Sequence, residues 1–138
     1  MTIQAQILEL VRKIQRDEGM SVLLITHDLG VIAEMCDRVA VMYAGRVVET
    51  GAALDIFDRP AHPYTRGLLA SRPSIAAGNQ WLSTIEGTVP AVGQSGPGCS
   101  FAPRCHYVRD ACHRGEPELV SFDLMRSRRC VVPQQELA

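Results

Sequence analysis

The run Ser21-Val-Leu-Leu-Ile-Thr-His-Asp-Leu-Gly30 decides the expected fold. Its apolar half, residues 22–25, is continuous and includes β-branched side chains. This pattern favours a strand buried on both faces of a parallel sheet over a buried helix segment. His27 and Asp28 follow directly, and Asp28 is a natural N-cap for a short helix over residues 29–36. A buried strand that leads into a helix predicts an α/β fold.

Regular elements are expected on both sides of this run. Residues 3–18 have apolar side chains at steps of three and four, which predicts an amphipathic helix that ends at Gly19. On the other side, residues 38–43 and 46–50 have the composition of two strands. Ala44-Gly45 between them is a tight hairpin signal.

The pattern then becomes less regular. A short helix is expected over residues 52–57, and Pro63 fits the first turn of another that runs to about residue 71. Residues 72–98 are rich in Pro and Gly, which indicates a linker or an irregular lobe with one short strand at most, over residues 85–89.

Composition narrows the class of protein. The chain has 138 residues, a formal net charge of -1, 46% hydrophobic and 21% charged residues, which is typical of a globular chain and not of a disordered one. The charge opposes binding to nucleic-acid phosphates. Aromatic residues make up only 5%, so a core of aliphatic side chains is expected. The apolar runs are far shorter than the roughly 20 residues of a spanning helix, and no signal segment is visible, so we expect a cytosolic chain with reduced thiols.

His27 is the first candidate for chemistry. It lies where the expected strand ends, and ligands of open α/β sheets bind at the carboxyl ends of strands. A histidine there can donate a hydrogen bond to a phosphate oxygen. Taken alone, however, a His-Asp pair at this place is more often a helix cap with a local hydrogen bond.

A family resemblance adds to this reading. The runs Ser21–Ala33 and Cys36–Gly51 closely resemble the ATP-binding subunits of ABC transporters, and the resemblance is nearly continuous from Met1 to Ser71. It implies that His27 is the switch histidine, which senses the γ-phosphate of ATP. The run Asp55-Ile-Phe-Asp-Arg-Pro-Ala-His-Pro-Tyr-Thr-Arg-Gly-Leu-Leu69 resembles the subgroup that serves oligopeptide, dipeptide and nickel importers.

Several motifs of that family are absent from the chain. No glycine-rich loop ends in Gly-Lys-Ser/Thr, and such a loop holds the phosphates in these ATPases. The missing motifs would lie before Met1, so ATP and magnesium are expected only in the complete subunit, and the chain alone is not expected to hydrolyse ATP. We therefore expect residues 1–72 to form the C-terminal part of a P-loop NTPase (ABC ATPase) domain. Residues 73–138 are expected to form a small, irregular, cysteine-rich extension.

Four cysteines in this extension suggest a second site. Cys99, Cys105, Cys112 and Cys130 follow the spacing C-x5-C-x6-C-x17-C. Four thiolates suit a [4Fe–4S] cluster or tetrahedral zinc, although structural zinc sites usually use closer pairs. Two disulfides or four unrelated thiols are the other readings of the spacing.

The surroundings of these cysteines favour the cluster. Five arginines near them could offset the charge of the thiolates: Arg104, Arg109, Arg114, Arg128 and Arg129. The run Gly98-Cys-Ser-Phe-Ala-Pro-Arg-Cys105 resembles the C-terminal cluster region of the peptide importers, which implies an iron–sulfur cluster with a structural role. The fifth cysteine, Cys36, is read as a small buried hydrophobe.

Three functions are consistent with the sequence. The leading one is the C-terminal part of an importer's ATP-binding subunit, located at the cytoplasmic face of the membrane. Its partners would be a second ATP-binding subunit, two membrane permeases and, indirectly, a substrate-binding protein. The alternative is a non-catalytic remnant or a small metal-binding accessory module. A zinc-ribbon nucleic-acid binder is the third, and the net charge opposes it.

Overall fold

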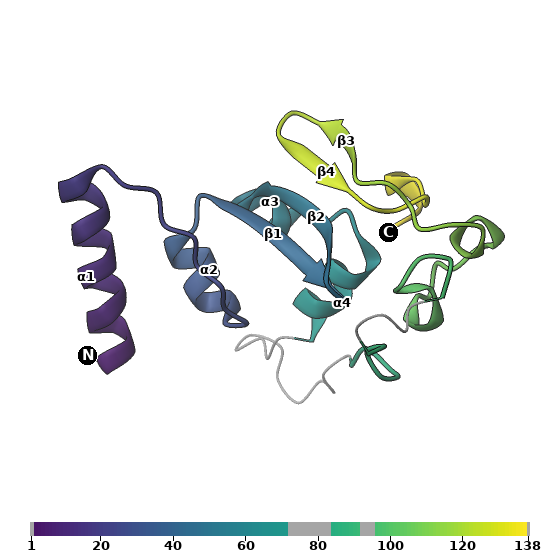
Figure 1. The fold of residues 1–138 in the computed structure, drawn as a ribbon, viewed down its shortest axis with the longest axis horizontal. Coiled ribbons are helices and arrows are strands. Elements are labelled where there is room, and N and C mark those ends of the chain that lie inside the picture. The colour runs from purple at the N-terminus through teal and green to yellow at the C-terminus, as the bar shows by residue number, and fades with distance from the viewer. Residues whose placement is uncertain (1, 72–83, 92–95, 138) are drawn as a thin grey trace. The chain divides into compact units, whose positions relative to one another are not determined.

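The computed structural model describes residues 2–71, 84–91 and 96–137. The chain divides into two compact units, Met1–Asp37 and Arg38–Ala138. Figure 1 shows helices alone in the first unit and a mixture of helices and strands in the second. The expected boundary between residues 72 and 73 falls outside the described residues and stays a prediction.

The first unit contains the two predicted helices. Helix α1 spans Ile3–Glu18; the Thr2 hydroxyl accepts the Ala5 N–H at its start, and Gly19 ends it in the left-handed conformation, at a φ of 63°. Helix α2 spans Leu29–Met35, and Asp28 caps it as predicted. The ion pair between Arg12 and Glu34, at 3.1 Å, joins the two helices.

The predicted buried strand over residues 21–26 is wrong. These residues form no strand in the structure, and the side chains of Leu23 and Ile25 are 89% and 91% exposed. A strand of a parallel sheet needs neighbouring strands to take its backbone hydrogen bonds and helices to cover both faces. The described residues of the first unit provide two helices and no strand, so the segment has no partner there.

The second unit is built on an antiparallel sheet. Strand β1 (Arg38–Tyr43) and strand β2 (Arg46–Ala52) form the predicted hairpin, in which Ala44 and Gly45 both have positive φ, at 47° and 78°. Two consecutive residues with positive φ match the right-handed twist of the flanking strands. The expectation of a parallel sheet is therefore wrong for the described residues, and the fold is mixed α/β with an antiparallel sheet.

The cysteine-rich part of the chain completes this sheet. Strand β3 (Val120–Asp123) and strand β4 (Arg126–Arg128) form a second hairpin, and β4 pairs antiparallel with β2. The order is β1-β2-β4-β3. The expected extension is thus partly regular and shares a sheet with the preceding part of the chain, as Figure 1 shows.

Helices follow the first hairpin. Helix α3 spans Ala53–Asp58 and helix α4 spans Pro63–Ala70, close to the predicted bounds. Three short 3-10 helices lie further on: η1 (Ala102–Arg104), η2 (Asp110–His113) and η3 (Gln134–Glu136). Residues 85–89 form no strand, so that prediction is wrong; the rest of the expected linker lies largely outside the described residues.

The core of the second unit is aromatic. Tyr43, Val48 and Phe101 are buried together, and the rings of Tyr43 and Phe101 meet edge-on at 5.2 Å between centroids. Tyr64 packs on both rings, at 4.8 Å and 5.5 Å. Most of the buried hydrophobic residues described are aliphatic, as expected, while the few aromatic residues gather at this one place. Phe101 thereby anchors the segment between Cys99 and Cys105 to the sheet.

Candidate functional site

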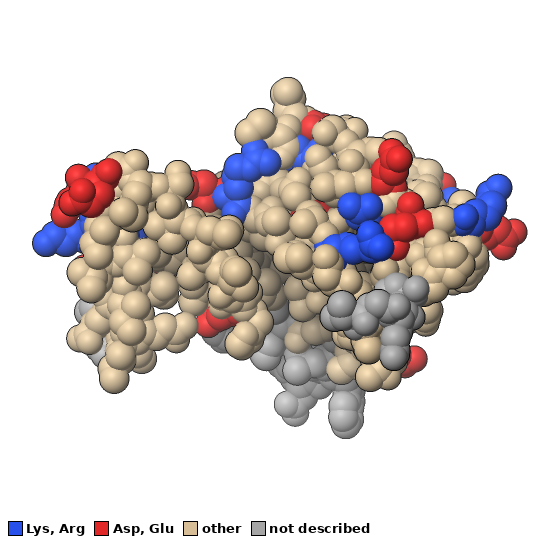
Figure 2. Space-filling model, viewed as in Figure 1, with Lys and Arg blue, Asp and Glu red and all other residues tan. Residues whose placement is uncertain are grey.

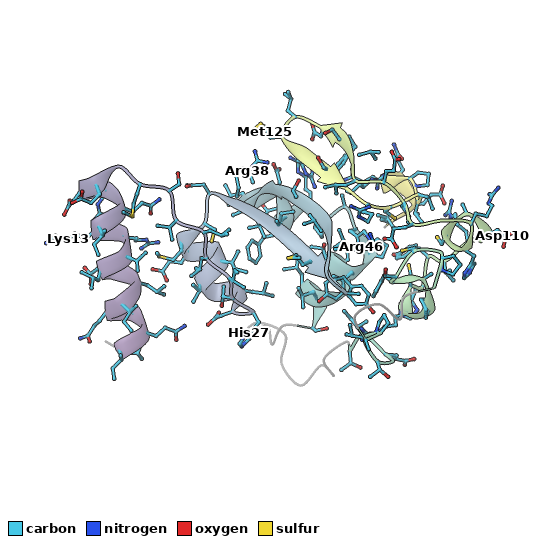
Figure 3. The ribbon with its side chains drawn as sticks, viewed as in Figure 1. Lys13, His27, Arg38, Arg46, Asp110 and Met125 are labelled. Atoms are coloured by element: carbon cyan, nitrogen blue, oxygen red, sulfur yellow. The ribbon has the colours of Figure 1, made fainter. Side chains whose placement is uncertain are left out.

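His27 lies in the first unit, at the turn that precedes α2. Its side chain is exposed, and Figure 3 shows it at the tip of this turn. Asp28 beside it caps the helix, since its Oδ1 accepts the N–H groups of Gly30 at 2.8 Å and Val31 at 3.2 Å. These two bonds hold the pKa of Asp28 below its usual value. The role of His27 toward phosphate stays a prediction.

The four cysteines of the second unit lie at the ends of short elements. Cys99 and Cys105 flank η1, Cys112 lies within η2, and Cys130 follows β4. All four are free thiols; Cys112 is buried and the others are half-buried. The backbones of two of them are joined, because the Cys99 N–H donates to the Cys112 carbonyl at 2.8 Å.

Gly98 allows this close approach. A Cβ atom on Gly98 would lie 2.3 Å from the Cys112 carbonyl oxygen and 2.9 Å from the His113 Cα, so no larger residue fits without moving the backbone. The glycine therefore lets the segment of Cys99 run directly against η2.

The thiols influence one another. Burial is the largest cause that raises the pKa of Cys105 to about 11, and the charges of Cys130, Cys112 and Cys99 contribute to the same rise. Burial likewise raises the pKa of Cys99 and of Cys130.

Backbone N–H groups act in the opposite direction. Hydrogen bonds from Phe101 and Ala102 lower the pKa of Cys99, and one from Tyr107 lowers that of Cys105. The Val132 N–H donates to the Cys130 sulfur at 3.4 Å. Such donors favour the thiolate form, which is the form that binds metals.

The sulfur atoms are nevertheless not arranged as a ligand set. Across residues 2–71, 84–91 and 96–137, no group of three or more His, Cys, Asp or Glu side chains is placed to hold a metal ion. The donor chemistry fits a four-thiolate site, while the arrangement described does not form one.

Four of the five arginines near the cysteines divide into two groups. Arg128 and Arg109 carry charges that lower the pKa of Cys130. Arg104 and Arg129 bind backbone carbonyls instead: Arg104 donates to Ile85 at 2.8 Å and Glu86 at 2.7 Å, and Arg129 to Val47 and Pro117. The expectation that all five arginines offset thiolate charge is therefore too broad.

A buried polar cluster around Glu49 was not predicted. The Glu49 side chain is fully buried in β2, and its carboxylate accepts the N–H groups of Ala61 at 2.7 Å and His62 at 3.0 Å. Buried Arg126 of β4 faces it at 3.7 Å. The only sequence signal was an acidic residue within the strand Arg46-Val-Val-Glu-Thr-Gly51, where an apolar side chain is expected.

Comparison with known proteins gives the family. Residues 48–112 match the family of the oligopeptide/dipeptide transporter, C-terminal region. The oligopeptide transport ATP-binding protein AppD of Bacillus subtilis is 46% identical over 99% of the chain, and so is the dipeptide transport ATP-binding protein DppD of Haemophilus influenzae. The chain is similar to the C-terminal region of the ATP-binding proteins of the oligopeptide/dipeptide transporters. It spans about two fifths of the length of these relatives, 42% of AppD and 41% of DppD.

The transporter C-terminal region includes most of the candidate cysteines. Cys99, Cys105 and Cys112 lie within the matched residues 48–112, as do Glu49 and His62, while Cys130 lies beyond them. His27 lies before the matched region, in a part of the chain that only the whole-chain similarity covers.

Two further properties bear on this transporter region. No helix among its described residues is long and apolar enough to cross a membrane. Arg side chains lie intermingled with Asp and Glu on the face of the second unit drawn in Figure 2, and neither sign of charge dominates that face. This face lacks the basic stripe that nucleic-acid binding requires.

Proposed function

We propose that the chain is part of an ATP-binding subunit that drives import of oligopeptides or dipeptides. The observation that carries the proposal is the 46% identity to a peptide-transport ATP-binding protein over 99% of the chain. In this account the segment before residue 72 is the C-terminal part of a P-loop ATPase domain. The apolar run over residues 22–25, which is exposed here, would then be covered by the remaining domain of the complete subunit.

Nucleotide chemistry then belongs to the complete subunit. The chain has no phosphate-binding loop, and its relatives are more than twice as long. ATP and magnesium would be held by that longer portion, while His27 would donate a hydrogen bond to the γ-phosphate. Asp28 supports this role, because its two backbone hydrogen bonds fix the turn that carries the histidine.

The partners follow from this role. A second ATP-binding subunit would share the nucleotide, two permeases would form the membrane path, and a substrate-binding protein would act indirectly. The subunit would then be peripheral, at the cytoplasmic face of the membrane.

A His27→Ala variant tests the nucleotide part of the proposal. In the purified importer complex we expect the kcat for ATP hydrolysis to fall at least about tenfold, with little change in the KM for ATP, because the histidine acts on the phosphate in the transition state. His106→Ala, another exposed histidine, is the control and should leave turnover unchanged. Equal turnover in the two variants would remove His27 from the mechanism.

We further propose that Cys99, Cys105, Cys112 and Cys130 hold a [4Fe–4S] cluster, with zinc as the alternative. The mutual effect of the four thiols on the pKa of Cys105 and the backbone N–H groups directed at the sulfurs support it. Four cysteinyl ligands would tie η1, η2 and the end of β4 together, and the role would be structural.

Anaerobic reconstitution with iron and sulfide tests this site. The chain should take up about four irons and four sulfides with the visible absorption of a cubane. Cys105→Ser should lose the cluster, while Cys36→Ser, which lies in the other unit, should keep it. If the chain took up one zinc and no iron, the site would be assigned to zinc instead of the cluster. If it took up neither metal, the proposed site would be refuted.

A further inference from the structure

A cavity in the second unit takes no part in the chemistry proposed above. Its volume is about 730 Å³, within the usual range of small-molecule sites. It is lined by the end of α3, one side of α4 and residues around η1. None of the four cysteines is among its described lining residues, so the cavity is not the candidate metal site.

Helix α4 presents one face to the cavity. Four of its residues, spaced three and four apart, are in the lining: Pro63, Arg66, Gly67 and Ala70. Residues at this spacing lie along one side of a helix. His62 caps the start of α4, where Pro63 fits the first turn. The place of Arg66 on the cavity wall is therefore set by a capped helix.

A second wall is held by hydrogen bonds and packing. The guanidinium of Arg104 donates to the carbonyls of Ile85 at 2.8 Å and Glu86 at 2.7 Å, and to the Tyr43 hydroxyl at 3.3 Å. Ile85 in turn packs closely on α4, because a Cβ atom on Gly67 would lie 2.9 Å from the Ile85 Cγ1. This wall is therefore fixed by contacts within the second unit.

Much of the lining is apolar. The apolar side chains are those of Pro60, Pro63, Ala70, Ile85 and Phe101. Phe101 is buried in the aromatic core, which fixes its ring. Release of water from such a surface favours a ligand that brings an apolar group.

The charges of the lining leave one cation without a partner. The described lining residues that are ionised at neutral pH are Arg59, Arg66, Arg104 and Asp58. Arg59 pairs with Asp55, and Arg104 donates to the three acceptors named above. The half-buried side chain of Arg66 makes no hydrogen bond or ion pair with the residues that the structure describes. One guanidinium is thus left to bind an anion.

We propose that this cavity binds a small carboxylate that carries an apolar group. The guanidinium of Arg66 holds the carboxylate in the planar two-bond geometry that arginine favours, and the apolar group lies against Ile85 and Phe101. A single unpartnered guanidinium matches the one charge of a carboxylate better than the two charges of a phosphate, and Asp58 opposes a second negative charge. The inference depends neither on peptide import nor on the metal site.

Titration of the isotope-labelled full chain with phenylacetate, followed by NMR, tests the site. We expect saturable shifts of the backbone amides of Gly67 and Phe101, which line the cavity, and none at Leu10 in the first unit. Phenylacetamide, the neutral counterpart, should bind at least about tenfold more weakly, the factor for a hydrogen bond to a charged group. Acetate, which lacks the apolar group, should also bind at least about tenfold more weakly, because it leaves the apolar lining in water.

Two variants separate the charge from the apolar wall. Arg66→Met keeps an apolar side chain with good helix propensity and removes the charge. It should bind phenylacetate at least about tenfold more weakly and phenylacetamide as the unchanged chain does, which also shows that the variant is folded. Ile85→Ala should weaken both ligands by the same factor. Arg114→Met, an exposed arginine outside the described lining, is the matched control and should change neither affinity.

Three results would overturn the inference. The first is the absence of saturable shifts at Gly67 and Phe101 up to the solubility of phenylacetate. The second is an equal affinity for phenylacetate in Arg66→Met and in the unchanged chain, which would remove the arginine from the site. The third is binding of acetate or inorganic phosphate as tight as that of phenylacetate, which would show that the apolar wall is not used.

Discussion

At the scale of single residues, His62 is buried in a neutral form. Desolvation by burial is the largest cause that lowers the pKa of His62 from 6.5 to about 4. Below pH 6.5 the His62 imidazole is protonated in the unfolded chain, whereas in the folded chain it stays neutral until the pH approaches 4. The stability that this residue contributes is complete above pH 6.5 and is lost as the pH falls toward 4.

This shift gives a pH prediction. A difference of about 2.5 pKa units corresponds to about 3 kcal/mol between pH 7 and pH 4. Urea unfolding of the full chain should therefore show a stability that falls over this range, and His62→Asn should flatten the fall. Burial raises the pKa of Glu49, so its effect on the pH dependence of stability is opposite to that of His62. The stability that Glu49 contributes is present at low pH and is lost as the pH rises through its folded pKa. If the free energy of unfolding fell equally with pH in His62→Asn and in the unchanged chain, the account would be contradicted.

At the scale of elements, the β3–β4 hairpin is held to β2 by a buried ion pair. Arg126 is 2% exposed and faces fully buried Glu49 at 3.7 Å; it also donates to the Arg59 carbonyl and lies over the ring of Phe122. The cost of desolvating the two charges offsets much of their attraction, so the intact pair adds little net stability. Removing one partner is costly, because it leaves the other charge buried and unpaired.

A double-mutant cycle tests this element. Arg126→Met leaves the Glu49 carboxylate buried without its cation and should cost about 3–5 kcal/mol of unfolding free energy. Adding Glu49→Gln should recover most of the loss, because the amide still accepts a backbone hydrogen bond and carries no charge. Arg38→Met, an exposed arginine that donates to the Met125 carbonyl, is the control and should change stability by less than about 1 kcal/mol. If the double variant were no more stable than Arg126→Met, the unpaired charge of Glu49 would not be the cause of the lost stability.

The elements also show what sequence patterns can predict. Helices α1, α2 and α4 and the β1–β2 hairpin were predicted, since their caps and turn residues act on neighbours a few positions away. Strand β4 was not predicted, because Arg126-Ser-Arg128 has no apolar alternation and its partner β2 lies far away in sequence.

The candidate sites were also predictable only where the signal lies in residue type and local spacing. The cysteines were visible from residue type and spacing, although the described arrangement is not a ligand set. The Glu49 carboxylate accepts backbone N–H groups of Ala61 and His62, which lie outside its own strand, so an acidic residue within that strand was the only sequence signal of this cluster. The strand over residues 21–26 failed for the opposite reason: its pattern is right for a sheet, but no neighbouring strand is present among the described residues.

At the scale of the whole molecule, the two units differ in how much they bury. Helix α1 has no buried residue, and its apolar side chains Ile3, Ile7 and Leu10 are 76%, 55% and 56% exposed. A helix of 16 residues without tertiary packing is marginal in water. The second unit, in contrast, buries a hydrophobic cluster of Tyr43, Val48 and Phe101.

Hydrogen exchange should report this difference. In the full chain at neutral pH, amides of α1 should exchange at least about tenfold faster than those of β2, because local opening of α1 exposes little new surface. Leu10 amide exchange compared with that of Val48 gives the ratio directly. Equal protection of α1 and β2 would mean that α1 is packed more firmly than its exposure indicates.

Import of peptide is the central claim, and uptake of a labelled dipeptide by cells tests it most directly. Cells that lack the gene for this chain should lose uptake of the labelled dipeptide or of a labelled oligopeptide, and a plasmid copy should restore it. The same copy with His27→Ala should restore little. Full uptake of both peptides in cells without the gene, with no other peptide importer expressed, would contradict the account.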